Sequence, residues 1–122
     1  MQREEIVKSY FQAWLNQDVE PLKNIFFKDA IYSEYYGPVY HGLPQILKWF
    51  DEWNCNGKVL KWDIQRFIHQ DLLTVVEWTL ENNYNDEIGR IDGVSIFEFN
   101  TDHKIVSVKE FQSKSEHNYP YE

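Results

Sequence analysis

The sequence predicts an α+β fold in which three N-terminal helices pack on a strongly curved, mainly antiparallel β-sheet. The first observation is that three segments before residue 58 have the apolar spacing of helices. The second is that the pattern changes from residue 58 onward to strand-like segments separated by turn residues. The third is the stretch 90–111, where two apolar runs flank the turn sequence NTDH and indicate a hairpin. Such a hairpin needs neighbouring strands and an apolar cover, which the rest of the chain supplies.

The helices are expected at residues 3–15, 19–27 and 45–53. Pro21 falls in the first turn of the second helix, where proline is tolerated. The first helix should be amphipathic, because its apolar residues recur at i, i+3 or i+4, and i+7 and form one aromatic-rich face. These residues are Ile6, Val7, Tyr10, Phe11, Trp14 and Leu15.

The strands are expected in five segments that are rich in β-branched and aromatic residues. In the longest one, strict alternation would put Trp62, Ile64 and Arg66 on one side of the sheet and Phe67 on the other. A curved antiparallel sheet closed by helices on one side forms a cone with an interior. The expected strands are residues 30–36, 59–69, 72–81, 94–99 and 105–111, with loops at 37–42 and 82–89.

We expect residues 1–122 to form one domain, with residues 113–122 as a loosely held polar tail. The formal net charge of −8 opposes binding to nucleic acid and to anionic membrane surfaces, since both require clustered basic residues. The charged N-terminal segment lacks the apolar core of a signal peptide. No apolar stretch approaches the roughly 20 residues of a membrane span. A cytoplasmic location is therefore expected.

The aromatic content is high, with five Trp, eight Tyr and eight Phe. Rigid aromatic side chains line small-molecule sites as well as cores, so the excess favours a pocket for a small apolar or aromatic molecule. Plain core packing is the alternative for each residue taken separately. The candidate wall residues are Trp14, Tyr32, Trp78, Phe97 and Phe99.

Four stretches, in their order and spacing, resemble the SnoaL-like or nuclear-transport-factor-2-like superfamily over nearly the whole chain. That resemblance implies a cystatin-like, cone-shaped α+β barrel with an apolar pocket, commonly a homodimer through the outer face of the sheet. It does not specify an activity, because the superfamily contains isomerases, cyclases, dehydratases, epoxide hydrolases and binding modules. The stretches are YFQAW at 10–14 with DVE at 18–20, FFKDA at 26–30, HG-PQI at 41–46, and IFEF at 96–99 with KIV at 104–106.

Within this superfamily the chain is similar to the ketosteroid isomerases. The resemblance places Tyr10 at the position of their oxyanion-hole tyrosine and Glu34 at that of their general-base aspartate. Ser95 falls at the position of their protonated aspartate, which is a departure, because a serine hydroxyl can only donate a weaker hydrogen bond. The resemblance therefore implies an incomplete catalytic set for steroid isomerisation.

The residues themselves point to Glu34 as a base, because a carboxylate between Tyr32 and Tyr36 loses solvation and its pKa rises. The alternative is a rim glutamate exposed to water. Glu110 is a second candidate, on an otherwise apolar strand face, with Arg66 as its expected partner. The alternative for Glu110 is a structural ion pair. Asp92 should face the opposite side of the sheet from Ser95.

The remaining polar residues carry weaker signals. His41 lies in a loop beside the expected pocket mouth and is a candidate ligand contact. The four histidines are scattered and Cys55 is the one cysteine, so neither a metal site nor an internal disulfide is expected. No cofactor-binding motif is recognisable.

Three functions remain open from the sequence. The first is a cofactor-independent isomerase, cyclase or hydrolase, in which Glu34 moves the proton, Tyr10 binds an oxyanion and Glu110 assists. The second is a module that binds a small apolar ligand without chemistry. The third is a dimeric scaffold whose cavity is filled by its own aromatic side chains.

Overall fold

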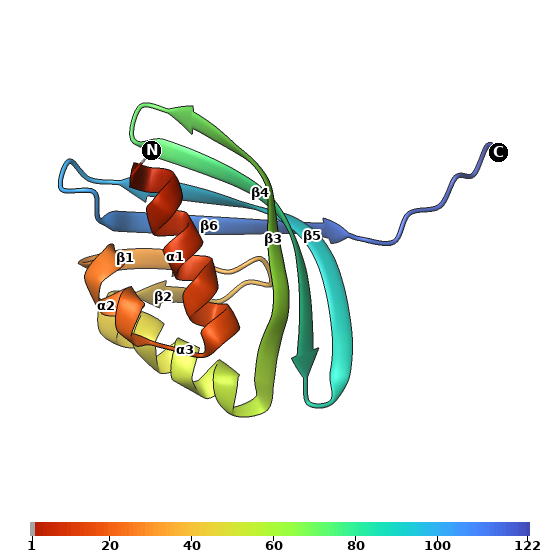
Figure 1. Cartoon of the computed structure of the whole chain (residues 1–122), viewed down its shortest axis with the longest axis horizontal. Coiled ribbons are helices and arrows are strands. Elements are labelled where there is room, and N and C mark those ends of the chain that lie inside the picture. The colour runs from red at the N-terminus through yellow and green to blue at the C-terminus, as the bar shows by residue number, and fades with distance from the viewer. Residues whose placement is uncertain (1) are drawn as a thin grey trace.

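The computed structural model describes residues 2–122 and consists of three helices and one six-stranded sheet. Figure 1 shows α1 crossing one side of the sheet, with α3 along its lower edge and the long strands β3, β4 and β5 bending around the helices. The predicted α+β class is confirmed, and the strongly curved sheet with helices on one face is the expected cone.

The three helices begin and end close to the predicted residues: α1 is Gln2–Asn16, α2 is Glu20–Ile25 and α3 is Leu43–Asn56. The aromatic face of α1 is buried, with Tyr10 fully inaccessible to solvent. Helix α2 ends earlier than expected, because Phe26 already has extended backbone geometry and begins the next strand. Pro21 occupies its first turn, as predicted.

The sheet has the order β2-β1-β6-β5-β4-β3. All neighbouring strands are antiparallel except β1 and β6, which are parallel. The last strand therefore returns to the middle of the sheet and joins its N-terminal and C-terminal halves. The strands are β1 Phe26–Ser33, β2 Val39–His41, β3 Gly57–Gln70, β4 Leu73–Tyr84, β5 Glu87–Phe99 and β6 Ile105–Lys114.

The first strand differs from its prediction at both ends. It begins at Phe26 rather than residue 30 and ends at Ser33, so Glu34 lies in a turn and not in a strand. The predicted loop 37–42 contains the short strand β2, which pairs with β1. The stretch was too short and too polar to show strand alternation, and its pairing with β1 decides its conformation.

The expected alternation along β3 is wrong because two β-bulges interrupt it. Register shifts lie between Val59 and Lys61 and between Ile64 and Arg66. Each extra residue reverses the facing of the side chains that follow. Phe67 therefore packs on the core, whereas Arg66 lies on the outer face and pairs with Glu77 at 3.3 Å. Arg66 is not the partner of Glu110.

The strands of the second half are longer than predicted. The loop expected at 82–89 is a tight turn, because β4 runs to Tyr84 and β5 begins at Glu87. Ser113 and Lys114, assigned to the tail, are paired with β5. The residues after Lys114 run away from the body of the molecule (Figure 1).

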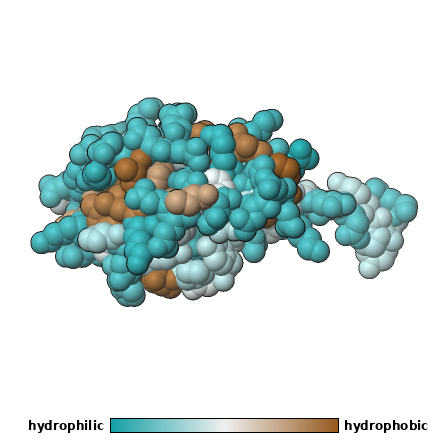
Figure 2. Space-filling model, turned by 90° about the horizontal axis from the view of Figure 1, so that it is seen from below, coloured by the Kyte–Doolittle hydropathy of each residue, from teal (hydrophilic) through white to brown (hydrophobic). Residues whose placement is uncertain are grey.

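The core lies between the helices and the concave face of the sheet and is mainly aromatic. Phe11 stacks on Trp62 with ring centroids 3.8 Å apart, and Tyr10 contacts several neighbouring rings edge-on. Figure 2 shows a surface dominated by hydrophilic residues, with apolar residues gathered in small groups. Among residues 2–122, no helix has the length and apolar composition needed to cross a bilayer.

Candidate functional site

A small cavity of about 40 Å³ lies between the helices and the sheet and is partly open to solvent at its outer end. As it stands, this volume suits one or two water molecules, because each takes up roughly 30 Å³ in the liquid. Side chains from both helical and sheet elements form its wall. The lining residues are Trp14, Tyr32, Glu34, Tyr35, Trp49, Trp53, Val59, Trp62, Trp78, Leu80, Asn82 and Glu110.

Glu110 is the buried carboxyl group of this cavity, with 7% of its surface exposed. Strand β6 turns it inward, and the parallel pairing with β1 brings Tyr32 close to it. The hydroxyls of Tyr32 and Ser95 donate hydrogen bonds to its Oε2 atom, at 2.7 and 3.0 Å. Among residues 2–122, no hydrogen bond reaches its Oε1 atom and no cation pairs with it. One oxygen is thus fixed by the protein and the other is unpartnered.

Burial raises the pKa of Glu110 to about 8, and the nearby charge of Glu34 adds to this effect. The hydrogen bonds from Tyr32 and Ser95 lower the pKa, but by less than burial raises it. The carboxyl group is therefore mostly protonated at pH 7. A protonated carboxyl can donate a hydrogen bond or a proton to a molecule in the cavity.

A chain of hydrogen bonds extends behind Glu110 into the core. Tyr10 donates to the hydroxyl of Tyr32 at 2.7 Å, and the indole N–H of Trp78 donates to Ser95 Oγ at 2.9 Å. Burial and the proximity of Glu110 raise the pKa of both tyrosines well above the usual range, so both phenols are neutral. This network holds Tyr32 and Ser95 in place and so fixes the carboxyl group of Glu110.

Glu34 lies at the edge of the same cavity with 9% of its surface exposed. Its backbone closes a turn: its N–H donates to the carbonyl of Pro38 at 2.9 Å, and its carbonyl accepts from Gly37 at 3.3 Å. Gly37 has a φ of 118°, a conformation that favours glycine. The Tyr40 hydroxyl donates to Glu34 Oε2 at 2.8 Å. Burial raises the pKa of Glu34, and its hydrogen bonds offset part of the rise.

Aromatic rings form most of the remaining cavity wall. Trp49 stacks on Tyr40 with centroids 4.8 Å apart and also contacts Trp14 at 5.0 Å. Trp62 meets Trp78 edge-on at 5.5 Å. The indole N–H groups of Trp14, Trp49 and Trp62 are buried and have no acceptor among the described residues. Such unsatisfied donors are uncommon in folded proteins and indicate that a polar occupant or an aromatic face meets them.

The structure brings together several of the predicted site residues. Trp14, Tyr32, Trp78, Glu34 and Glu110 all line the cavity. The carboxyl groups reach it from different elements, Glu34 from the turn after β1 and Glu110 from β6. This arrangement can hold a small molecule against aromatic rings and exchange protons with it at two carboxyl groups.

Other predicted residues lie elsewhere. Tyr10 and Ser95 stand one hydrogen bond behind the wall. Phe97 and Phe99 pack in the core, and Phe97 contacts Tyr10 with centroids 6.1 Å apart. His41 is exposed in β2, away from the cavity wall.

Sequence reasoning missed some residues of the wall. Trp49 and Trp53 lie in the predicted third helix, and their i, i+4 spacing puts two indole rings on one patch of its surface. Tyr35 and Asn82 fell in segments expected to end a strand or form a loop. No sequence signal separates Trp62 from a core residue, because the bulges decide where it faces.

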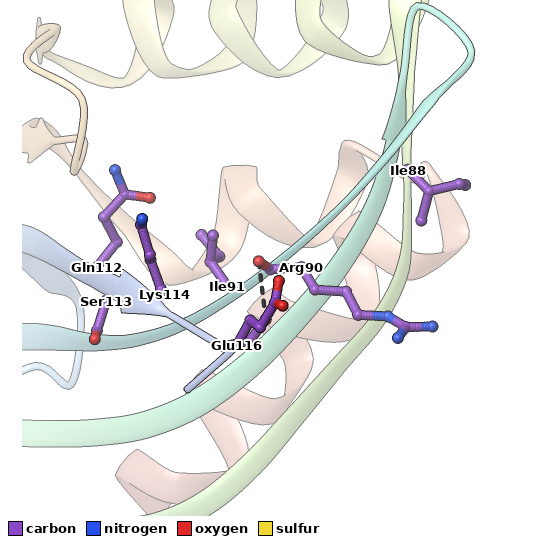
Figure 3. Close-up of a pocket in the computed structure, with 8 residues that line it drawn as sticks. Ile88, Arg90, Ile91, Gln112, Ser113, Lys114 and Glu116 are labelled. Atoms are coloured by element: carbon purple, nitrogen blue, oxygen red, sulfur yellow. Dashed lines mark hydrogen bonds between the residues drawn. The ribbon is translucent and has the colours of Figure 1, made fainter. Parts of the chain in front are cut away.

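A second hollow lies on the surface, where the end of β6 meets the start of β5. Figure 3 shows Arg90, Lys114 and Glu116 around it, with Ile88 and Ile91 nearby. It is open to solvent, and its walls combine charged, polar and aliphatic side chains. The hydroxyl of Ser115 donates to the carbonyl of Arg90 at 3.2 Å and ties its rim together. It lacks the buried polar groups of the internal cavity, which is therefore the candidate functional site.

Possible metal ligands are dispersed in this structure. Within residues 2–122, no three His, Cys, Asp or Glu side chains come close enough to hold a metal ion. Cys55 is exposed and unpaired at the end of α3.

Comparison with known proteins agrees with the geometry. The model of the SnoaL-like domain family matches residues 7–108. No curated protein sequence matches the chain significantly.

Three solved structures illustrate how well the fold is shared. An LEH-like epoxide hydrolase of M. tuberculosis has a TM-score of 0.80 at 14% identity, over 89% of this chain and 80% of that one. A protein with a ketosteroid isomerase-like fold from Catenulispora acidiphila, in complex with trimethylamine, has a TM-score of 0.79 at 16% identity, with coverage of 91% and 86%. An NTF-2 like protein of unknown function from Burkholderia xenovorans has a TM-score of 0.77 at 21% identity, with coverage of 98% and 88%. At these identities the likeness concerns the fold alone.

Proposed function

The chain belongs to the SnoaL-like domain family, and on that premise we propose that it is an enzyme using two carboxyl groups to move protons on a small organic molecule. The reaction would be an isomerisation, cyclisation or hydrolysis that needs only the side chains of the chain itself. The substrate is small and mostly apolar, because aromatic rings make up most of the cavity wall.

One observation carries this proposal: Glu34 and Glu110 line the same aromatic cavity, and neither has a cation as partner among residues 2–122. Buried carboxyl groups are costly unless they are paired, so an unpaired couple in one cavity is typical of a functional site. Burial raises the pKa of both groups, which brings them toward the range where acid–base catalysis is effective at neutral pH.

The environments of the two groups suggest different roles. Glu34 lies at the cavity edge, and its pKa rise is partly offset by hydrogen bonds, so it serves as the base. Glu110 is deeper and keeps its proton at pH 7, so it serves as the acid. Tyr32 and Ser95 orient Glu110, and Tyr10 acts one step further back as a positioning residue for Tyr32.

The size of the cavity implies that it opens to admit a substrate. Typical ligand sites enclose several hundred Å³, whereas this cavity has about 40 Å³. Tyr35 and Trp53 are only half-buried and form its outer wall. Movement of these two side chains, together with the turn at Gly37, would enlarge the site and is the opening step we propose.

The test is a proton-exchange assay. The protein is incubated in D2O with a panel of small ketones and β-dicarbonyl compounds, and deuterium uptake beside the carbonyl is followed by proton NMR. We expect wild-type protein to accelerate uptake for part of the panel, Glu34→Gln to abolish the acceleration and Glu110→Gln to reduce it. Glu77→Gln is the matched control, because Glu77 lies on the outer sheet face beside Arg66. Uptake unaffected by both cavity substitutions would contradict the acid–base assignment.

A non-catalytic binding module is the second candidate, favoured by the aromatic rings that form most of the cavity wall. It makes a different prediction for the same samples. Panel compounds would change the tryptophan fluorescence of the wild-type protein while deuterium uptake stays at the rate of protein-free solution.

A further inference from the structure

We propose that the molecule bound in this cavity carries a small alkylated amine, held as an ammonium ion between aromatic rings and the carboxylates of Glu34 and Glu110. This inference rests on the proposed function in one respect, that the internal cavity is the ligand site. It goes further by naming the charge and the chemical class of the group that the cavity recognises.

The first support is the aromatic character of the wall. Seven of the twelve lining side chains are aromatic: Trp14, Tyr32, Tyr35, Trp49, Trp53, Trp62 and Trp78. A cation over the face of an aromatic ring is attracted by its negative face, most strongly at tryptophan. The rings are inclined to one another, as in Trp14 and Trp53 at 88° and Trp62 and Trp78 at 87°, so their faces do not all point the same way. Enclosure by inclined rings is how proteins bind methylated ammonium groups.

The second support is the balance of charge around the cavity. Glu34 and Glu110 line it, while no Lys, Arg or His in the described part of the chain does. The other titratable side chains on the wall are Tyr32 and Tyr35, whose pKa values burial raises, so they are neutral at pH 7. Tyr10 and Tyr40, which bond to Tyr32 and Glu34, are likewise neutral. A positive ligand is thus the missing partner for this pair of carboxyl groups.

The third support is the geometry at Glu110. Two hydroxyls converge on Oε2, and no side chain or backbone group of residues 2–122 bonds to Oε1. Burial keeps this carboxyl group mostly protonated at pH 7. When a neutral amine enters, the O–H bond of Glu110 breaks and an N–H bond forms, which leaves a carboxylate beside an ammonium. When the amine arrives already protonated, the proton of Glu110 passes to solvent instead, and the ammonium N–H takes over the acid role assigned to Glu110 in the proposed function.

A neutral oxygen compound is the competing ligand class. The unpartnered indole N–H groups of Trp14, Trp49 and Trp62 would suit a carbonyl or hydroxyl oxygen. Such a ligand would leave the charge of Glu34 without a partner, which is why the amine is favoured. The two classes are separated by comparing molecules of the same shape that differ in charge.

The experiment uses the intact protein with trimethylammonium chloride and with tert-butanol, which has the same three methyl groups without the charge. Binding at pH 7 is measured by tryptophan fluorescence and by calorimetry in phosphate and in MOPS buffer, whose heats of ionisation differ, with sodium chloride at equal concentration as the salt control. We expect trimethylammonium to bind about tenfold more tightly or better. The measured heat should differ between the buffers, because binding releases a proton from Glu110.

Variants localise the effect. We expect Glu34→Gln and Glu110→Gln to abolish the preference for the cation, and Glu77→Gln to retain it. Circular dichroism checks that each variant is folded, and the two-buffer comparison on wild-type protein stands without any variant.

Three outcomes of these binding experiments would overturn the inference. Equal or tighter binding of tert-butanol overturns it while leaving the proposed acid–base site intact. Binding of neither compound overturns it as well, and the deuterium-uptake assay then tells whether the proposed function fails with it. Cation binding that survives both cavity substitutions would place the ammonium elsewhere and also overturn the inference.

Discussion

Ser95 and Glu110 are directly opposite each other on β5 and β6, and the hydroxyl of Ser95 donates a 3.0 Å hydrogen bond to Glu110 Oε2. The similarity to the ketosteroid isomerases placed Ser95 where those enzymes carry a protonated carboxylic acid. The neighbouring strand supplies a carboxyl group that lines the cavity and accepts the hydrogen bond of Ser95. Because burial raises its pKa to about 8, this group is mostly neutral at pH 7. Position 95 thus carries a serine instead of a carboxylic acid, and the neutral carboxyl group of Glu110 lies opposite it on the next strand.

The first prediction concerns the stability of Glu110→Gln. The pKa of Glu110 rises from 4.5 to about 8 on folding, so wild-type stability is fully present below pH 4.5 and falls as the pH rises toward 8. At about 1.4 kcal/mol per pKa unit, the loss amounts to a few kcal/mol in total. Glutamine resembles the protonated acid and lacks this loss. Thermal melts should show the variant near wild type at pH 5 and more stable at pH 9.

Glu98→Gln is the control for this comparison, since Glu98 is exposed on the outer face of β5. Its melting temperature should change between pH 5 and pH 9 by the same amount as that of the wild-type protein. A Glu110→Gln variant that is less stable than wild type at pH 9 would show that the charged form is stabilised in the fold.

The second prediction concerns Glu34, whose pKa burial raises above its ordinary value. The charged form is therefore disfavoured in the folded protein, and Glu34→Gln should leave the melting temperature at pH 7 unchanged or higher. The side-chain amide keeps an oxygen to accept the hydrogen bond from Tyr40. Carbon-detected NMR titration of the Glu34 carboxyl gives its pKa directly. A depressed pKa together with a destabilised variant would rule out the general-base role.

The third prediction concerns the contact between α1 and β3. His69 Nε2 lies 2.7 Å from Glu4 Oε2, and this hydrogen bond is the largest of the effects that lower the pKa of Glu4. Stability from this contact is present above pH 4.5 and is lost as the pH falls through the lowered pKa. We expect Glu4→Gln to lower the melting temperature at pH 7. Between pH 5 and pH 3, the melting temperature of this variant should decrease less than that of the wild-type protein.

The neighbouring variant Glu5→Gln serves as the reference, since Glu5 meets only Lys8, at 3.8 Å on the surface. It should melt close to wild type at each pH. Identical acid profiles for Glu4→Gln and Glu5→Gln would show that the contact with His69 does not stabilise the fold.

The fourth prediction concerns Gly93, which faces Trp78 across β4 and β5. A Cβ atom at this position would overlap the indole ring of Trp78. Gly93→Ala should therefore displace the ring, break its hydrogen bond to Ser95 and destabilise the protein by about 1–3 kcal/mol. A Cβ atom at Gly89, in the same strand, would meet only the movable end of the Asn82 side chain, so Gly89→Ala should reduce the free energy of unfolding by less. Urea unfolding of both variants, followed by tryptophan fluorescence, makes the comparison; equal costs would contradict it.

The fifth prediction concerns assembly, and we propose a homodimer through the outer face of the sheet. Val94 and Phe111 are paired there, and Phe111 is 56% exposed. Ile68, Val75 and Ile96 form a second apolar row across three strands of the same face. Exposed apolar groups of this kind mark contact surfaces, and a twofold dimer would bury both rows.

Sedimentation equilibrium at micromolar concentration is the measurement for the dimer. We expect wild-type protein to be dimeric and Phe111→Asp to shift it toward monomer. Tyr121→Asp in the exposed tail is the control and should not change the mass. A monomeric wild-type protein would refute the proposed interface.

The sequence by itself determined the fold class, the element order and most of the core. Helical spacing in α1 and the apolar runs of β4 and β6 identify these elements, because burial of one face is a local, periodic property of the chain. Trp78 lies on the buried face of β4 together with Val76 and Leu80, as uninterrupted alternation predicts. The family followed from short stretches in a fixed order.

Only the tertiary structure decided which residues meet. The bulges in β3 turn Phe67 inward and Arg66 outward. A single inserted residue of this kind cannot be recognised from the amino-acid composition of the strand. Glu34 lies in a turn because β1 pairs with the short strand β2 as far as Ser33 and Val39, so residues 34–38 connect the two strands. The hydrogen-bond partners of Glu110 are Tyr32 and Ser95. No spacing rule in the sequence connects these residues, because they meet through the parallel pairing of β1 with β6 and the antiparallel pairing of β5 with β6. The charge state of the site depends on this burial, and burial is a property of the assembled fold.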